Sequence, residues 1–117
     1  MQKTIFGRRG EELARKYLEN KGYHFVTCNF KRVHGEIDLI MEDGATLVFV
    51  EVKSRHNRKY GEPAEAVNYA KQRHILYCAK IYISEKRIGG RRIRFDVVEV
   101  MISTAGEAKF RHIKNAF

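Results

Sequence analysis

Two apolar segments, both interrupted by acidic residues, flank one Asp-Gly pair in the first half of the chain. The first segment, residues 35–41, has the sequence GEIDLIM, and the second, residues 45–53, has the sequence ATLVFVEVK. An Asp-Gly pair between two such segments is a strong signal for a β-hairpin. Charged side chains are rare in strands that are otherwise apolar and buried. The hairpin therefore predicts the centre of a sheet with a polar site built into it.

The pairing of the two strands decides whether their acidic residues meet. With Asp43-Gly44 as a two-residue loop, Asp38 pairs with Phe49, and Glu51 lies two residues further along on the same face. This diagonal places the two carboxylates within about 7–8 Å of each other. A three-residue loop would shift the register by one residue and put them on opposite faces. The prediction of a shared site therefore depends on the turn.

Asp38, Glu51 and Lys53 together suit metal-assisted chemistry. Two carboxylates on one face repel each other unless a cation lies between them, and Mg²⁺ prefers oxygen ligands. Lys53 shares the face of Glu51 and can hold a phosphate oxygen or orient the attacking water. The alternative is an exposed sheet face on which Glu51 and Lys53 neutralise each other. The apolar run around Glu51 favours the first interpretation, which is a site for phosphodiester hydrolysis.

A helix is predicted over residues 7–20, ending before Gly22, which suits the left-handed position that follows a helix. Its apolar face consists of Leu13, Ala14, Tyr17 and Leu18. Glu11 lies at the edge of this face and can turn toward the sheet, whereas Glu12 lies opposite and is expected in solvent. The alternative role for Glu11 is that of an acidic residue in the first turn, where it offsets the helix dipole.

A second helix is predicted from an N-cap at Asn68 to about residue 85, with further strands over 23–29, 91–102 and 108–113. Gln72 falls within the apolar stripe of this helix, which is formed by Ile75, Leu76, Ala79 and Ile83. A buried amide needs partners, and a carboxylate, a phosphate or the loop before the helix are all open. The element order is α-β-β-β-α-β-β, which predicts a mixed α/β fold, and 117 residues fit one domain.

The charge balance points to an acidic partner. Lys and Arg number 23 against 14 Asp and Glu, which gives a formal net charge of +9. Nucleic acid is the first expectation and an anionic membrane surface the second. A solvated charged surface is the alternative for any one cluster, and packing is the favoured interpretation of Tyr69 and Tyr77 over base stacking. The basic residues next to the predicted site are Arg8, Arg9, Lys31, Arg32, Arg55, Arg58 and Lys59.

Several classes of protein are excluded by what the sequence lacks. No apolar run approaches the roughly 20 residues of a membrane helix, and no signal peptide is visible, so we expect a cytoplasmic protein. Cys28 and Cys78 stand far apart without a CxxC pattern, which argues against a zinc site or a disulfide framework. The five histidines have no metal-binding spacing, and no catalytic triad or phosphate-binding glycine loop occurs.

The sequence resembles the YraN family over almost its whole length. The resemblance lies in the segments GEELA at residues 10–14, GEIDLI at 35–40, FVEVKSR at 49–55, Lys71-Gln72, RFDVV at 94–98 and IKNAF at 113–117. That family is similar to archaeal-type Holliday junction resolvases and, through them, to the PD-(D/E)xK, restriction-endonuclease-like nucleases. The resemblance implies a mixed sheet flanked by helices. Ile37 stands where the superfamily motif has a proline, a common departure.

The resemblance also implies a site. It assigns Asp38 and Glu51 as metal ligands, Lys53 as the catalytic lysine and Gln72 as a supporting polar residue. Glu11 matches the helix acid of the group, and we expect it to add a metal ligand directly or through water. From the residues alone, Glu36 shares the face of Asp38 and is either a further carboxylate of the site or lies in solvent.

Together these features lead us to expect an endonuclease that uses Mg²⁺, or alternatively Mn²⁺, and acts on DNA. The resemblance adds branched or junction DNA as the substrate and a homodimer as the assembly. The rivals are a non-catalytic nucleic-acid-binding module that retains the fold and a basic protein that joins a larger assembly.

Overall fold

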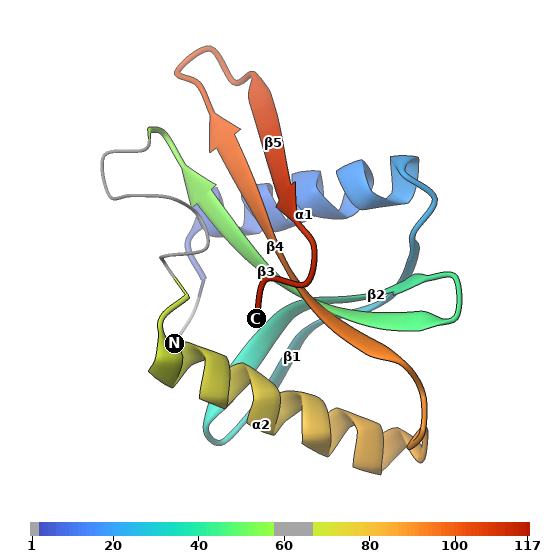
Figure 1. The fold of residues 1–117 in the computed structure, drawn as a ribbon. Helices are drawn as coiled ribbons and strands as arrows, with labels where there is room; N and C mark the ends of the chain where they lie inside the picture. Colours follow the sequence, from blue (N-terminus) through green and yellow to red (C-terminus); the bar gives the residue numbers. More distant parts are fainter. Residues whose placement is uncertain (1–2, 58–66) are drawn as a thin grey trace.

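A computed structural model describes residues 3–57 and 67–117, which form a five-stranded sheet between two helices (Figure 1). The predicted order α-β-β-β-α-β-β is confirmed. Arg58 and Lys59, predicted to bind nucleic acid, lie outside the described residues. The elements are α1 (Ile5–Asn20), β1 (His24–Arg32), β2 (Gly35–Asp43), β3 (Thr46–Arg55), α2 (Tyr69–Lys86), β4 (Ile93–Ile102) and β5 (Ala108–Ile113).

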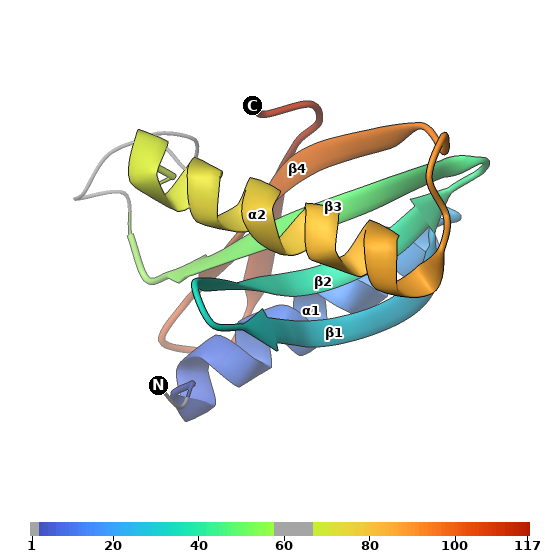
Figure 2. The ribbon, with the colours of Figure 1, turned by 90° about the horizontal axis from the view of Figure 1, so that it is seen from below.

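The sheet has the strand order β1-β2-β3-β4-β5 and is open. Neighbouring strands are antiparallel except β3 and β4, which run parallel. A parallel pair needs a crossover connection, and α2 lies in that connection. Helix α1 covers one face of the sheet and α2 the other (Figures 1 and 2). The mixed α/β class with two flanking helices is therefore confirmed.

Each face of the sheet buries its own apolar layer, because side chains alternate between faces along a strand. Ala14 and Leu18 of α1 pack on Leu39, Met41, Val48 and Val50, among others. Ile75, Cys78, Ala79 and Tyr82 of α2 pack on Phe49, Phe95 and Val97. Strand β3 contributes to both layers and is buried on both faces, so a charged residue within it is enclosed unless it reaches an opening.

Capping residues set where the helices begin. Thr4 caps α1 by accepting a hydrogen bond from the backbone N–H of Gly7, so the helix starts two residues earlier than predicted. Glu11 consequently lies in the second turn, and the alternative in which it offsets the dipole from the first turn is wrong. Asn68 caps α2 as predicted, by accepting from Lys71 N–H. Gly22 follows α1 with φ of +95°.

The β2–β3 turn corrects the predicted register. Asp43 pairs with Thr46, so Gly44 and Ala45 form the two-residue loop, and Ile40 rather than Asp38 pairs with Phe49. Gly44 takes a φ of +60° while Ala45 does not have positive φ, which is the requirement of a type II′ turn with glycine first. The predicted pair of Asp38 with Phe49 is therefore not formed, and the last pair of the β2–β3 ladder toward Asp38 is Leu39 with Val50.

A buried acidic residue anchors the C-terminal segment on β4. Asp96 is fully enclosed and accepts hydrogen bonds from Arg94 Nε at 2.8 Å and from the backbone N–H of Asn115 at 3.0 Å. His112 Nε2 lies 2.7 Å from its other oxygen. Burial raises the pKa of Asp96, but these hydrogen bonds outweigh it and hold the pKa below its ordinary value. This network ties β4, β5 and the chain end together.

Neither of the two helices in the described part of the chain is long and apolar enough to cross a membrane.

Candidate functional site

Asp38 lies where the β2–β3 ladder opens. The pairing extends to Leu39 opposite Val50, and beyond it Asp38 Oδ2 accepts a hydrogen bond from the backbone N–H of Val52 at 2.8 Å. The alternation of β2 is also broken here, because Ile37 and Ile40 belong to the same apolar layer although they are three residues apart. The side chain of Asp38 therefore accepts the hydrogen bond that a backbone carbonyl of β2 would accept in a regular ladder. Its other oxygen, Oδ1, remains available to another partner.

Three carboxylates from α1 and β2 converge beside this opening. One oxygen each of Glu11, Glu36 and Asp38 lie within 4.8 Å of one another. Glu11 and Asp38 are buried, with 8% and 7% of their surface exposed, and Glu36 is half-buried. Burial raises the pKa of Glu11, opposed by its hydrogen bond from Lys3. The predicted turn of Glu11 toward the sheet is confirmed, and Glu36 lies within the cluster rather than in open solvent.

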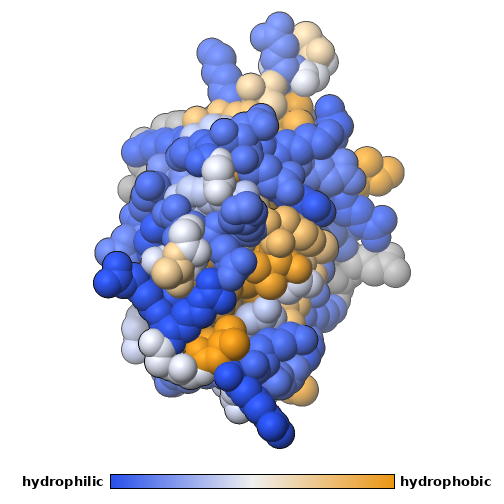
Figure 3. Space-filling view, turned by 90° about the vertical axis from the view of Figure 1, so that its right-hand side faces the viewer, coloured by the Kyte–Doolittle hydropathy of each residue, from blue (hydrophilic) through white to orange (hydrophobic). Residues whose placement is uncertain are grey.

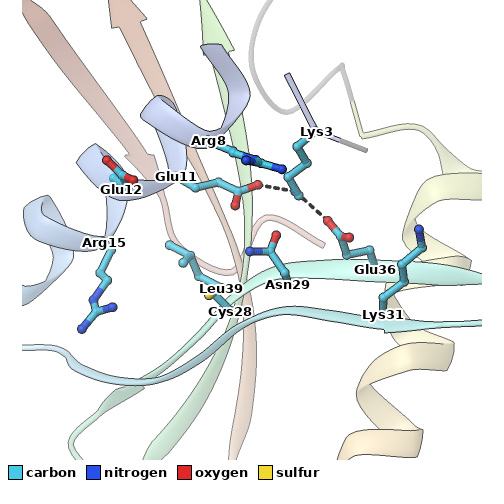
Figure 4. A pocket seen from close by; sticks show the side chains of 10 residues that line it. All are labelled: Lys3, Arg8, Glu11, Glu12, Arg15, Cys28, Asn29, Lys31, Glu36 and Leu39. Carbon is cyan, nitrogen blue, oxygen red and sulfur yellow. Dashed lines mark hydrogen bonds and ion pairs between the residues drawn. The ribbon is translucent and has the colours of Figure 1, made fainter. Parts of the chain in front are cut away.

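The ammonium group of Lys3 occupies the centre of this cluster. Its Nζ lies 2.6 Å from Asp38 Oδ1. It also lies 2.6 Å from Glu36 Oε1 and pairs with Glu11, and these two contacts are drawn in Figure 4. Burial lowers the pKa of Lys3, but attraction to Asp38 and the hydrogen bonds raise it well above its ordinary value. Lys3 therefore stays charged at neutral pH, and a cation lies where the three carboxylates meet. Lys3 was not predicted from the sequence, because it lies outside any helix or strand. Its position next to Thr4, the N-cap of α1, was the one feature that could have pointed to it.

Glu51 faces two lysines from the side of α2. It is 4% exposed, and its Oε2 lies 3.1 Å from Lys71 Nζ and 3.4 Å from Lys53 Nζ. Burial first and the charge of Asp38 second raise the pKa of Glu51 to about 7, against the opposing effect of the two lysines. Lys71 was not among the predicted site residues. Glu51 can therefore exchange a proton near neutral pH, and Asp38 influences its charge.

One cleft of about 560 Å³ connects these groups. Its lining includes all four predicted catalytic residues, which come from α1, β2 and β3. It also includes Glu36 and the two lysines that sequence reasoning did not select, Lys3 and Lys71. Carboxylate and ammonium groups are interspersed in it, with Lys3 among the three carboxylates and two lysines beside Glu51. Such a cleft can hold a hard cation together with an anionic group.

Comparison with known proteins identifies relatives of similar length and related sequence. The model of the "Uncharacterised protein family UPF0102" matches residues 10–100, a span that contains Glu11, Asp38, Glu51 and Lys53. The chain belongs to the UPF0102 family. A UPF0102 protein of Clostridium beijerinckii is 47% identical over 112 residues, which cover 95% of this chain and 91% of that protein. One from Alkaliphilus oremlandii is 45% identical over 119 residues and covers all of both chains.

The supporting residue Gln72 of this UPF0102 protein contacts the loop before its helix. It is half-buried, and its Nε2 donates a hydrogen bond to the carbonyl oxygen of Val67 at 3.0 Å. Of the three partners left open by the sequence, the loop is the one the structure provides. Its supporting role in the site stays a prediction.

The predicted nucleic-acid-binding residues differ in how freely they can meet a ligand. Arg8, Arg9 and Lys31 are exposed, and Arg8 and Lys31 line a neighbouring hollow of about 600 Å³ together with Glu11 (Figure 4). Arg32 instead forms an ion pair with Glu85 of α2 at 2.6 Å. Arg55 is half-buried. Hydrophilic side chains dominate the face in Figure 3, with separate apolar patches between them.

The pKa of Glu51 leads to a pH-dependent stability in metal-free solution. Because the folded-state pKa is about 7 against an ordinary 4.5, the folded protein holds this proton more tightly than the unfolded chain. The stabilising contribution is complete below pH 4.5 and is lost as the pH rises through 7. Glu51→Gln cannot ionise, so its stability relative to wild type should increase by on the order of 2 kcal/mol between pH 4.5 and pH 8.

Urea unfolding of both proteins across this range, with a chelator present, measures the difference. Glu12→Gln on the exposed face of α1 is the matched control and should follow the wild-type pH dependence. Parallel stability curves for wild type and Glu51→Gln would contradict the raised pKa.

Proposed function

We propose that this protein is a metal-dependent endonuclease that hydrolyses phosphodiester bonds in DNA. The observation that carries the proposal is the convergence of Glu11, Glu36 and Asp38 on one cation position, beside Glu51 and Lys53 in the same cleft. Buried carboxylates that approach this closely are costly unless they hold a cation. A cleft that combines them with a lysine on a buried strand is suited to phosphoryl chemistry.

The donor set fits a hard divalent cation. Carboxylate oxygens are the ligands that Mg²⁺ and Mn²⁺ prefer, and no cysteine or histidine is part of the cluster in the described residues. Asp38, Glu51 and Glu11 would hold the ion, with Glu36 as a further carboxylate. When bound, the ion supplies Lewis-acid stabilisation of the charge on a phosphoryl group. Lys3 supports this assignment, because its ammonium shows that the cluster accommodates a positive charge; it would move aside for the ion.

Lys53 has a separate role in the proposal. Its side chain is 25% exposed, and it approaches Glu51 from the same face of β3. From this position the ammonium can hold a non-bridging phosphate oxygen and orient the attacking water. Lys71 adds a second positive charge on the α2 side of the cleft.

DNA is the proposed partner because of the formal net charge of +9 and the exposed Arg8, Arg9 and Lys31 next to the cleft. The resemblance to archaeal-type Holliday junction resolvases and to the PD-(D/E)xK nucleases supports branched or junction DNA as substrate. Since a junction presents two scissile strands, the same resemblance supports action as a homodimer. Both are part of the proposal.

Asp38→Asn tests the function most directly. The amide keeps an oxygen that can accept from Val52 N–H, so the fold is retained while the negative charge is lost. We expect Mn²⁺ and Mg²⁺ affinity, measured by calorimetry, to fall at least 10-fold, and cleavage of a panel of junction, flap, single-stranded and plasmid DNA to fall about 10³-fold. Lys3→Met is the matched control: it removes a charge from the same cluster without removing a ligand, so metal affinity should be kept or increased. Cleavage by pure Asp38→Asn at the wild-type rate would refute the proposed mechanism.

A non-catalytic nucleic-acid-binding module is the second candidate, and Lys3 is the observation that favours it. Lys3 forms ion pairs with all three carboxylates and so balances part of their charge without a metal ion. A protein that binds DNA without cleaving it needs such a balance, because unpaired carboxylates would repel the phosphates. This candidate predicts DNA binding with no heat of metal binding and no cleavage, and equal DNA affinity in wild type and Asp38→Asn.

A further inference from the structure

Helix α2 carries aromatic and apolar side chains on its outer face as well as on its buried face. Tyr69 is 73% exposed, Tyr77 41% and Leu76 40%. Packing was the favoured sequence interpretation of the two tyrosines, and Leu76 was assigned to the apolar stripe facing the sheet; the structure corrects all three. Figure 2 shows α2 as the outer layer of the molecule. Exposed aromatic rings in a row on a helix are an interaction surface that the fold itself does not use.

The exposed side chains form one stripe. At about 100° per residue, the positions of Tyr69, Arg73, Leu76, Tyr77 and Lys80 fall within an arc of about 100°. The guanidinium of Arg73 lies 5.8 Å from the ring of Tyr69. At the other side, the ring of His34 in the β1–β2 turn lies 5.4 Å from that of Tyr77, and the adjacent Val33 is 88% exposed. We call these five residues of α2 together with Val33 and His34 the α2 platform.

The charge of the α2 platform selects its partner. Arg73 and Lys80 are its charged members, and the one acidic residue of α2, Glu85, lies in the last turn and pairs with Arg32. The first turn of α2, which carries Tyr69 at one end of the platform, lies beside the cleft, because Lys71 on the sheet-facing side of the same turn contacts Glu51. Alternating aromatic rings and cations fit a polyanion with flat faces, which is a nucleic-acid strand with unpaired bases.

A second copy of this chain fits the platform less well. A symmetric contact between two copies would bring two platforms together whose charged members, Arg73 and Lys80, are all cations, so no ion pair could form across it. Interface cores are depleted of charged residues, whereas the platform has a cation beside each tyrosine along the helix. Tyr69 and Tyr77 are eight residues apart, about 12 Å along the helix axis. This spacing greatly exceeds the roughly 3.4 Å between stacked bases, so each ring would take a separate, unstacked base.

We propose that the α2 platform holds unpaired nucleotides of a DNA strand whose backbone continues into the acidic cleft. Bases stack on Tyr69 and Tyr77, and Arg73 and Lys80 contact the phosphates. This inference rests on the proposed function and specifies its substrate class, namely DNA with a single-stranded segment next to the scissile bond. A branched molecule with an open arm or flap meets this requirement, and a continuous duplex does not.

The test compares Tyr69→Ala/Tyr77→Ala with Tyr69→Phe/Tyr77→Phe in the full chain. Fluorescence anisotropy with a labelled single-stranded oligonucleotide and with the matching duplex, in the presence of a chelator, measures binding without cleavage. We expect the alanine variant to lose at least about 10-fold in affinity for the single strand and less than 2-fold for the duplex. The phenylalanine variant retains both rings and should bind as wild type does.

Four results would overturn the platform: no nucleic-acid binding by wild type, unchanged single-strand affinity in the alanine variant, an equal loss on duplex and single strand, or a dimer that dissociates when the tyrosines are replaced. Metal titration of the same variants separates the two proposals, because Tyr69 and Tyr77 are not part of the carboxylate cluster. Wild-type metal binding and cleavage with unchanged strand affinity refute the platform alone. A tyrosine-dependent single-strand affinity without metal binding or cleavage supports the platform and refutes the nuclease.

Discussion

Lys53→Met is expected to reduce the single-turnover rate of DNA cleavage by about 10²–10³-fold, because it removes a positive charge placed where negative charge develops. Methionine keeps an unbranched apolar stem of similar length, so β3 should pack as before. Calorimetric metal affinity should stay within about 2-fold of wild type, since Lys53 is not a ligand in the proposal. This separation of cleavage from metal binding distinguishes the role of Lys53 from that of Asp38.

Two further lysines provide controls for this prediction. Lys109→Met on β5 removes one exposed positive charge away from the cleft and should leave cleavage unchanged. Lys71→Met removes the other ammonium that faces Glu51 Oε2 and should reduce cleavage less than Lys53→Met does. If the two lysines of the cleft prove equally important, the effect comes from their shared influence on Glu51, and the specific role assigned to Lys53 is wrong.

The meeting of Asp38 with Glu51 was predicted from the sequence even though the predicted register was wrong. The turn uses Gly44 and Ala45 instead of Asp43 and Gly44, which shifts the pairing by two residues. A shift by two would preserve which side chains share a face, because strand side chains alternate with a period of two. The alternation of β2 is broken between Ile37 and Ile40, however, so Asp38 meets Glu11 of α1 whereas Glu51 faces Lys71 of α2. Both carboxylates line one cleft, but this irregularity of β2 could not be predicted from the alternation of its side chains.

The face of α2 could not be predicted in the same way. Apolar and aromatic residues occur almost all around this helix, so periodicity does not select one side. The side that packs on the sheet contains Ile75, Cys78, Ala79 and Tyr82, about 60° away from the predicted stripe. This rotation turns Leu76 outward and brings Lys71 toward the cleft. The orientation of α2 about its own axis therefore depends on which side chains fit against the sheet, and the helix sequence alone does not determine it.

Lys3 shows a second limit of sequence reasoning. Its contact with Asp38 joins residues 35 positions apart, and its segment belongs to no helix or strand. A long lysine side chain can reach many positions from one backbone location, so neither periodicity nor pairing indicates its partners. The three carboxylates were found from patterns, because helices and strands hold them, whereas the cation among them depended on the path of the chain before α1.

Gly10→Ala is expected to destabilise the protein by about 2 kcal/mol, in the range of overpacked cores, and to weaken metal binding. A Cβ at Gly10 would lie 1.6 Å from Ser54 Oγ and 2.9 Å from Ser54 Cβ, so α1 must move away from β3. Glu11 is the next residue, and its carboxylate moves with the helix. The close approach at Gly10 thus positions the α1 contribution to the site, which links packing directly to the proposed chemistry.

Urea unfolding and calorimetric Mn²⁺ titration measure both effects, and two variants identify their cause. Ser54→Gly removes the atoms nearest to the new methyl group, so Gly10→Ala/Ser54→Gly should recover stability and metal affinity relative to Gly10→Ala. Gly7→Ala is the helix control, because both variants gain about 1 kcal/mol of helix propensity. Its Cβ would lie 3.3 Å from Thr4 Oγ, a milder contact than at Gly10, so Gly7→Ala should cost less than Gly10→Ala. Equal stability of Gly10→Ala and Gly7→Ala would contradict the close packing of Gly10 against Ser54. If stability fell while metal affinity stayed at the wild-type value, Glu11 would not be a ligand.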